Sequence, residues 1–122
     1  MKSNKILVVD DDGEIRMVIK TILESSGYNV TQAKDGRECL DRLENERFDL
    51  ALVDFFMPIM SGRELVERIR ADKKLKNLKV AFLTSATLSK AGLEEFKKMN
   101  VLDYITKPFD NEDFIRRVKK II

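Results

Sequence analysis

The chain has 122 residues, of which 43% are hydrophobic, and its 23 basic and 21 acidic side chains leave a net charge of +2. This length allows one domain with a buried core, and the near balance of interspersed charges argues against direct binding of nucleic acid. The sequence contains no histidine, which excludes histidine-ligated metals. No apolar run approaches the roughly 20 residues of a membrane span. The single cysteine, Cys39, excludes an internal disulfide, and we expect a buried thiol in a cytoplasmic protein.

Short apolar segments separated by polar ones predict five strands. In chain order these are Lys5–Asp10, Tyr28–Ala33, Asp49–Asp54, Val80–Thr84 and Leu102–Thr106. The first, third and fourth are nearly continuous in apolar residues, which is typical of strands buried on both faces of a parallel sheet.

A helical pattern follows each predicted strand. Gly27 is expected to end the first helix, Ser61 and Gly62 to begin the third, and Asp110 to cap the fifth. Five alternating strands and helices predict a single α/β domain over residues 1–122, with an open doubly wound parallel sheet. The helical apolar positions are Ile15, Val18, Ile19, Ile22 and Leu23, then Leu40 and Leu43, then Leu65, Val66 and Ile69, then Leu93 and Phe96, and finally Phe114, Ile115 and Val118.

Polar residues stand where four of the five strands end. Ligands of open α/β sheets bind outside the carboxyl ends of the strands, so these residues are candidate site residues. In strand order they are Asp10, Asp11 and Asp12 after the first, Asp54 at the end of the third, Thr84 at the end of the fourth, and Lys107 after the fifth.

Each of these residues has a simpler interpretation when taken alone. An aspartate or threonine after a strand is commonly a helix cap, and a lysine before proline is commonly a solvated loop residue. Together they indicate more. Carboxylates from two strand ends suit Mg²⁺, whereas a lysine and a hydroxyl can hold phosphoryl oxygens. Aspartate is then the credible nucleophile of a phosphoryl-transfer site.

These segments, in this order and spacing, resemble the receiver domain of two-component response regulators, and the likeness covers the whole chain. The resemblance implies a flavodoxin-like five-stranded sheet in the order 2-1-3-4-5. The matching segments are Ile6 to Asp12, Asp49 to Pro58 with Gly62, Leu83 to Ser85, and Tyr104 to Phe109.

By that resemblance, Asp54 accepts a phosphoryl group from a histidine kinase or a histidine phosphotransfer protein. Mg²⁺ or Mn²⁺ is expected to be bound directly by Asp11, by Asp54 and by the backbone carbonyl of Phe56, and through water by Asp10. Asp12 is left as the cap of the first helix.

The resemblance also assigns a switch. Lys107 is expected to pair with the phosphoryl oxygens, and its bond to Pro108 to be cis. Thr84 would move its hydroxyl onto the phosphate while Tyr104 turns inward. These changes reshape the face built from the fourth helix, the fifth strand and the fifth helix, which is read by a downstream protein. At most, slow metal-dependent self-phosphorylation and self-dephosphorylation are expected, rather than enzymatic turnover.

Homodimerisation through that face stays open. Basic side chains lie near it that can equally be solvated, namely Arg116, Arg117 and Lys119. No membrane partner is expected.

Four residues depart from the commonest family pattern. Phe56 is bulky beside the acceptor, Ser85 replaces the usual alanine or glycine, and Asn100-Val101 stands where Gly-Ala is frequent. None removes a required group, although Phe56 is expected to slow self-dephosphorylation.

Two rival functions remain. In a haloacid-dehalogenase-like phosphatase, Asp10 would be the nucleophile and Asp12 the acid/base. Glu14 then stands where threonine is expected, and no acidic pair follows Lys107 on a further strand. A receiver that binds partners without phosphorylation is the other alternative.

Overall fold

The computed structural model describes residues 4–85 and 89–122. Strands and helices alternate along this part of the chain, as the sequence predicted. The elements are β1 (Lys5–Val9), α1 (Gly13–Ser25), β2 (Asn29–Ala33), α2 (Gly36–Asn45), β3 (Leu50–Asp54), α3 (Gly62–Ala71), β4 (Val80–Thr84), α4 (Lys90–Lys98), β5 (Val101–Thr106) and α5 (Asn111–Ile121).

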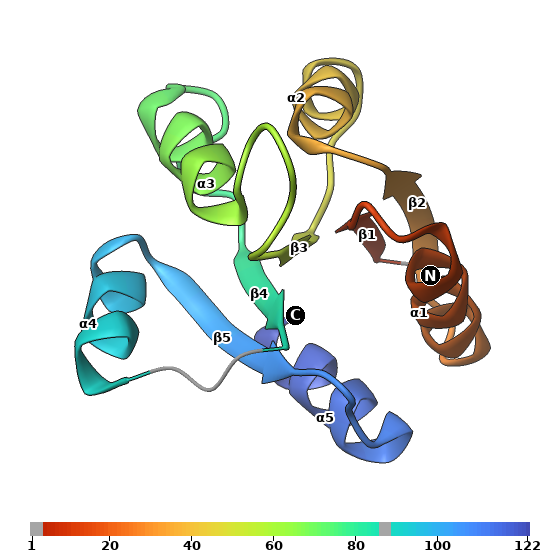
Figure 1. The fold of residues 1–122 in the computed structure, drawn as a ribbon. Helices are drawn as coiled ribbons and strands as arrows, with labels where there is room; N and C mark the ends of the chain where they lie inside the picture. Colours follow the sequence, from red (N-terminus) through yellow and green to blue (C-terminus); the bar gives the residue numbers. More distant parts are fainter. Residues whose placement is uncertain (1–3, 86–88) are drawn as a thin grey trace.

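The five strands form one parallel sheet in the order β2-β1-β3-β4-β5, which confirms the predicted fold class (Figure 1). Every residue of β3 and β4 is buried, and so are four of the five residues of β1. The edge strands β2 and β5 contain exposed and partly exposed residues beside a few buried ones. The most apolar strands therefore occupy the centre, because only there are both faces covered by helices.

Two helical layers cover the sheet. Helices α1 and α5 pack on one face, where Ile19 and Phe114 meet the β1 residue Ile6 and the β4 residue Leu83. Helices α2, α3 and α4 cover the opposite face (Figure 1). Within residues 4–85 and 89–122, no helix has the length and apolar character required to cross a membrane.

Helix ends lie where local sequence signals placed them. The carboxylate of Asp12 accepts the backbone N–H of Glu14 at 2.9 Å and caps α1. Ser61 and Asp110 cap α3 and α5 in the same way. Gly27, just beyond α1, has a φ of +92°, a conformation that glycine adopts without steric cost. These four predictions are confirmed.

The structure explains how two residues singled out in the sequence, Asn100 and Cys39, fit into the fold. Asn100 has a φ of +57°, which an asparagine tolerates better than most residues with a side chain. The guanidinium of Arg70 donates to the carbonyls of Met99, 2.9 Å away, and Asn100, 3.1 Å away, and thereby fixes the turn before β5. Cys39 is fully buried, as expected, and burial raises the pKa of its thiol to about 12.

Gly62 lets α3 begin directly against the backbone that follows β3. Its N–H donates to the carbonyl of Phe55 at 2.9 Å. A Cβ at this position would lie 2.5 Å from the carbonyl oxygen of Asp54 and 2.8 Å from the Cα of Phe55. Both neighbours are main-chain atoms, so neither can rotate away, and the close approach requires glycine.

We therefore expect Gly62→Ala to lower the free energy of unfolding by about 2 to 4 kcal/mol, because the helix must shift away from the strand end. Urea denaturation followed by circular dichroism measures this change. Gly13→Ala is the matched control, because its Cβ would meet only the flexible end of Arg16 at 3.4 Å. Equal stability of the two variants would contradict the steric argument.

Candidate functional site

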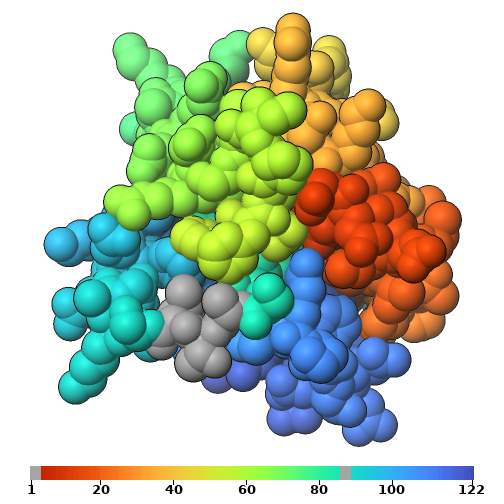
Figure 2. Space-filling model, viewed as in Figure 1, coloured from red at the N-terminus to blue at the C-terminus, as the bar shows by residue number. Residues whose placement is uncertain are grey.

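Three carboxylates gather at the carboxyl edge of the sheet. Asp10 and Asp11 follow β1, and Asp54 is the last residue of β3. One oxygen from each lies within 4.8 Å of the other two. Asp10 is fully buried and Asp54 is 6% exposed, whereas Asp11 is exposed. The space-filling view shows the chain after β1 (red), β3 (yellow-green) and β5 (blue) meeting on this face (Figure 2).

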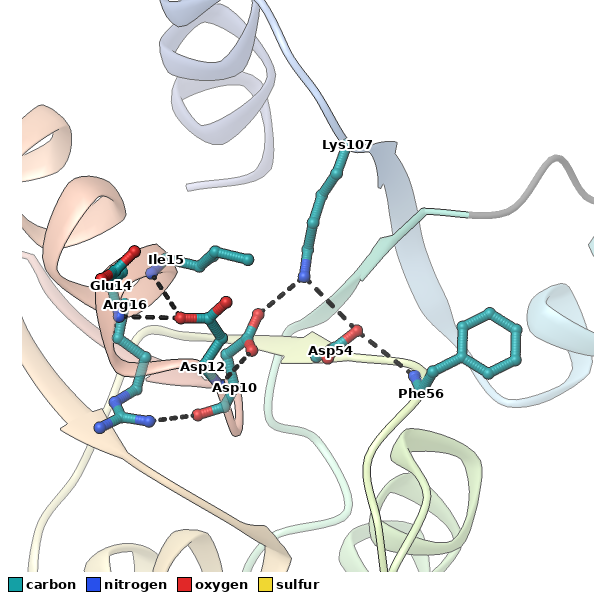
Figure 3. A network of polar contacts seen from close by, with 8 residues as sticks. All are labelled: Asp10, Asp12, Glu14, Ile15, Arg16, Asp54, Phe56 and Lys107. Carbon is teal, nitrogen blue, oxygen red and sulfur yellow. Dashed lines mark hydrogen bonds and ion pairs between the residues drawn. The ribbon is translucent and has the colours of Figure 1, made fainter.

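One lysine lies across the two buried carboxylates (Figure 3). The Nζ of Lys107 donates to Oδ2 of Asp10 at 2.8 Å and lies 3.6 Å from Oδ1 of Asp54. Its backbone N–H donates to the carbonyl of Thr84 at 2.7 Å, and its bond to Pro108 is cis, as expected. The end of β4 and the turn after β5 thus hold the ammonium group over the acidic cluster.

The surroundings of Asp54 disfavour its charged form. Burial, together with repulsion from Asp10, raises the pKa of the Asp54 carboxyl to about 6. Lys107 and the N–H of Phe56, which donates to Oδ1 of Asp54 at 3.3 Å, act in the opposite direction without cancelling the effect. The cluster therefore carries more negative charge than its own lysine offsets.

This donor set fits a divalent metal with a preference for oxygen. Three carboxylates converge, two of them are withdrawn from solvent, and the repulsion between them is of the kind that a bound cation relieves. Within the described residues 4–85 and 89–122, this is the one such group of acidic side chains. Asp10, Asp11 and Asp54 are the residues that would hold the ion.

The two predicted switch residues lie on adjacent strands. Thr84, the last residue of β4, is fully buried beside the site. Tyr104 lies on β5, pairs in register with Phe82, and is partly buried against the core formed with α2, α3 and α4. Phe56 is 55% exposed in the loop after Asp54, where its ring packs edge-on against Phe55.

Asp12, although next to the pair, does not join the cluster. Its carboxylate is engaged by the first backbone N–H groups of α1, from Glu14 and Ile15. The phosphatase alternative needs this side chain as an acid/base, so the cap weighs against that alternative.

Sequence reasoning missed Arg16. Its guanidinium reaches from α1 to the carbonyl of Asp10 at 2.5 Å and to Oε1 of Gln32 at 3.0 Å. The one available signal was a basic residue one turn after the Asp12 cap, and such residues are usually solvated. Its contact with the end of β1 depends on how α1 packs across two strands.

Comparisons with known proteins agree with this geometry. A family profile described as the response regulator receiver domain matches residues 6–119. Chemotaxis protein CheY-3 of Vibrio cholerae is 38% identical over 121 residues, which cover 98% of this chain and 92% of that protein. The transcriptional regulatory protein CpxR of Escherichia coli is 34% identical over 119 residues, which are 49% of its length. The chain thus spans nearly all of one relative and about half of the other.

Solved structures show the same fold. Chemotaxis protein CheY4 of Vibrio cholerae has a TM-score of 0.92 at 32% identity, with 99% of this chain and all of that chain covered. The response regulator TrrA of Thermotoga maritima, in complex with Mg²⁺ and BeF, has a TM-score of 0.84 at 33% identity. The match covers 98% of this chain and 99% of that chain. The strand order, the acidic cluster and these likenesses agree, and the chain belongs to the receiver domain family of two-component response regulators.

Proposed function

We propose that residues 1–122 form one receiver domain in which Asp54 accepts a phosphoryl group from a histidine kinase or a histidine phosphotransfer protein. The single observation that carries this is the position of Asp54, an almost buried carboxylate within reach of two other carboxylates and one lysine. We also propose that the protein works in the cytoplasm, where the thiol of Cys39 stays reduced.

The transfer is a displacement at phosphorus. A carboxylate oxygen of Asp54 attacks, the phosphorus–nitrogen bond to the donor imidazole breaks, and an acyl phosphate forms. Lys107 provides positive charge next to the incoming phosphoryl oxygens, with its Nζ already 3.6 Å from the acceptor carboxylate. The hydroxyl of Thr84 donates a further hydrogen bond to the phosphoryl group.

We propose Mg²⁺ or Mn²⁺ as the cofactor, bound by Asp11, Asp54 and the carbonyl of Phe56, and through water by Asp10. The ion would neutralise charge on the phosphoryl group and reduce repulsion between the carboxylates. Support comes from the convergence of the three side chains and from the Mg²⁺ complex of the similar receiver TrrA.

The output is a change in the face formed by α4, β5 and α5, which a downstream protein reads. Thr84 ends β4 beside the acidic cluster, and Tyr104 lies on the adjacent strand β5, which is part of this face. We propose that the two residues move together on phosphorylation. Two basic residues of α5 already have partners within the chain. Arg117 pairs with Asp103 at 3.0 Å and Asp113 at 3.1 Å, and Arg116 lies 3.6 Å from Asp113. A homodimer through this face would have to rearrange these ion pairs.

The first test is phosphorylation with Mg²⁺ and acetyl phosphate, followed by intact-protein mass spectrometry. One phosphoryl group is expected on the parent and none on Asp54→Asn, because the amide cannot act as the nucleophile. A phosphoryl group retained by Asp54→Asn would refute the assignment and point to Asp10. Absence of phosphorylation in a parent that binds Mg²⁺ would favour a receiver that acts without phosphorylation.

The exposed ring of Phe56 leads to a second expectation. Because it stands beside the acceptor, it should hinder the approach of water to the acyl phosphate. Phe56→Asn is therefore expected to shorten the lifetime of the phosphorylated protein roughly threefold or more. Loss of the label is followed over time after removal of the donor. Ile59→Asn is the control, because Ile59 is fully exposed in the same loop and should leave the lifetime unchanged.

An equal or longer lifetime of Phe56→Asn would contradict the shielding role.

The raised pKa of Asp54 gives a third expectation, for protein kept free of metal by a chelator. The carboxyl is neutral in the folded chain up to about pH 6, whereas the ordinary value is 3.8. Its ionisation therefore lowers stability progressively from about pH 3.8 to about pH 6. Asp54→Asn has no such loss. Its free energy of unfolding should therefore exceed that of the parent by about 1 to 3 kcal/mol at pH 8 and equal it near pH 3.

Urea titrations of the two proteins at several pH values measure this difference. Asp41→Asn, at an exposed position on α2, should show no comparable gain. A parent that is more stable than Asp54→Asn at pH 8 would contradict the electrostatic account.

A further inference from the structure

Arg16 lies on the opposite side of Asp10 from Lys107 (Figure 3). It belongs to the first turns of α1, and its side chain extends back over the ends of two strands. One terminal nitrogen donates to the carbonyl oxygen of Asp10 at 2.5 Å, and Nε donates to Oε1 of Gln32 at 3.0 Å. Arg16 thus joins α1, the end of β1 and the side chain of a β2 residue at one point.

Asp10 is held by both its backbone and its side chain. Its N–H donates to the carbonyl of Ala33 at 3.2 Å, and its carboxylate accepts from the Asp12 N–H at 2.9 Å and from Lys107 at 2.8 Å. The bond from Arg16 fixes the one remaining polar group, the carbonyl. That carbonyl is part of the planar peptide unit that leads to Asp11, so fixing it fixes the direction in which Asp11 leaves the strand.

Asp11 depends on this backbone restraint. Its side chain is exposed, and no hydrogen bond or ion pair holds its carboxylate within the described part of the chain. Nevertheless, its carboxylate oxygen lies within 4.8 Å of those of Asp10 and Asp54. The orientation of the Asp10–Asp11 peptide therefore sets the backbone position from which this carboxylate reaches the cluster.

We propose that Arg16 is a positioning residue of the metal site. It acts through the carbonyl of Asp10 to aim the carboxylate of Asp11 at Asp54, and Gln32 holds Arg16 in the required orientation. This inference rests on the proposed function in one respect, namely that the acidic cluster binds a divalent cation.

Positioning and charge predict opposite effects. A guanidinium near the cluster repels a metal ion, so removing its charge alone would strengthen Mg²⁺ binding. Removing a positioning bond weakens binding, as is usual for the outer partners of metal ligands. Arg16→Ala removes both charge and bond, Arg16→Gln removes the charge but keeps an N–H donor, and Gln32→Leu keeps the charge while removing the acceptor.

The test is Mg²⁺ titration by isothermal titration calorimetry, without any phosphoryl donor. We expect the Kd to rise roughly three- to tenfold for Arg16→Ala and by a smaller factor for Gln32→Leu, whereas Arg16→Gln, which loses the repelling charge but keeps a donor, should stay at or below the Kd of the parent. Arg68→Ala is the matched control, because it removes the same charge from the last turn of α3, and its Kd should equal that of the parent. Thermal unfolding with a chelator present checks that each variant is folded.

An unchanged or lower Kd in Arg16→Ala would overturn the proposal, and so would a Gln32→Leu variant with the affinity of the parent. If Arg16→Ala does not fold, Gln32→Leu decides, because it leaves Arg16 and its charge in place. Asp11→Asn separates this inference from the proposed function. A parent that does not bind Mg²⁺, or that binds it equally well as Asp11→Asn, refutes the metal site itself.

Discussion

The repulsion between two buried carboxylates governs the chemistry of this domain. Asp10 and Asp54 are both withdrawn from water at the same edge of the sheet, and the ammonium group of Lys107 pairs with both carboxylates. Its Nζ lies closer to Asp10, at 2.8 Å, than to Asp54, at 3.6 Å. The pKa of Asp54 consequently stays raised, at about 6. A second cation is therefore favoured at this place, and the proposed phosphoryl transfer would require such charge.

The core is what makes this unfavourable arrangement stable. β1 and β3 are neighbours in the sheet, and the register pairs Val9 with Val53, so Asp10 and Asp54, the residues that follow, emerge side by side. The apolar residues of these strands are buried on both faces, and a shift of register by one residue would turn each side chain to the opposite face and disrupt its packing. The free energy of that burial holds the carboxylates together. Gly62 completes the arrangement, because only glycine lets α3 begin against the backbone of Asp54.

Local sequence signals made the strands, the helix caps and the clustered site residues predictable. The apolar strands were located to within a residue or so at each end, and Asp12, Ser61 and Asp110 were identified as caps, because capping depends on a few adjacent residues. The identity of the clustered residues also followed, since parallel strands end at one edge. The bonds of Arg16 to Asp10 and Gln32 were not predictable. They depend on the packing of α1 across β1 and β2, which sequence spacing does not determine.

The three carboxylates differ in how firmly they are held, and this difference has a chemical consequence. Asp10 is bonded at its N–H, its carbonyl and both carboxylate oxygens, so its carboxylate is held firmly in one position. Asp54 is held more loosely, by a 3.3 Å bond from Phe56 and by the more distant lysine. A nucleophile must retain an available lone pair, and a strong bond from Lys107 would reduce its reactivity. By binding Asp10 more tightly, Lys107 supplies charge to the site while leaving the proposed acceptor oxygen available for attack.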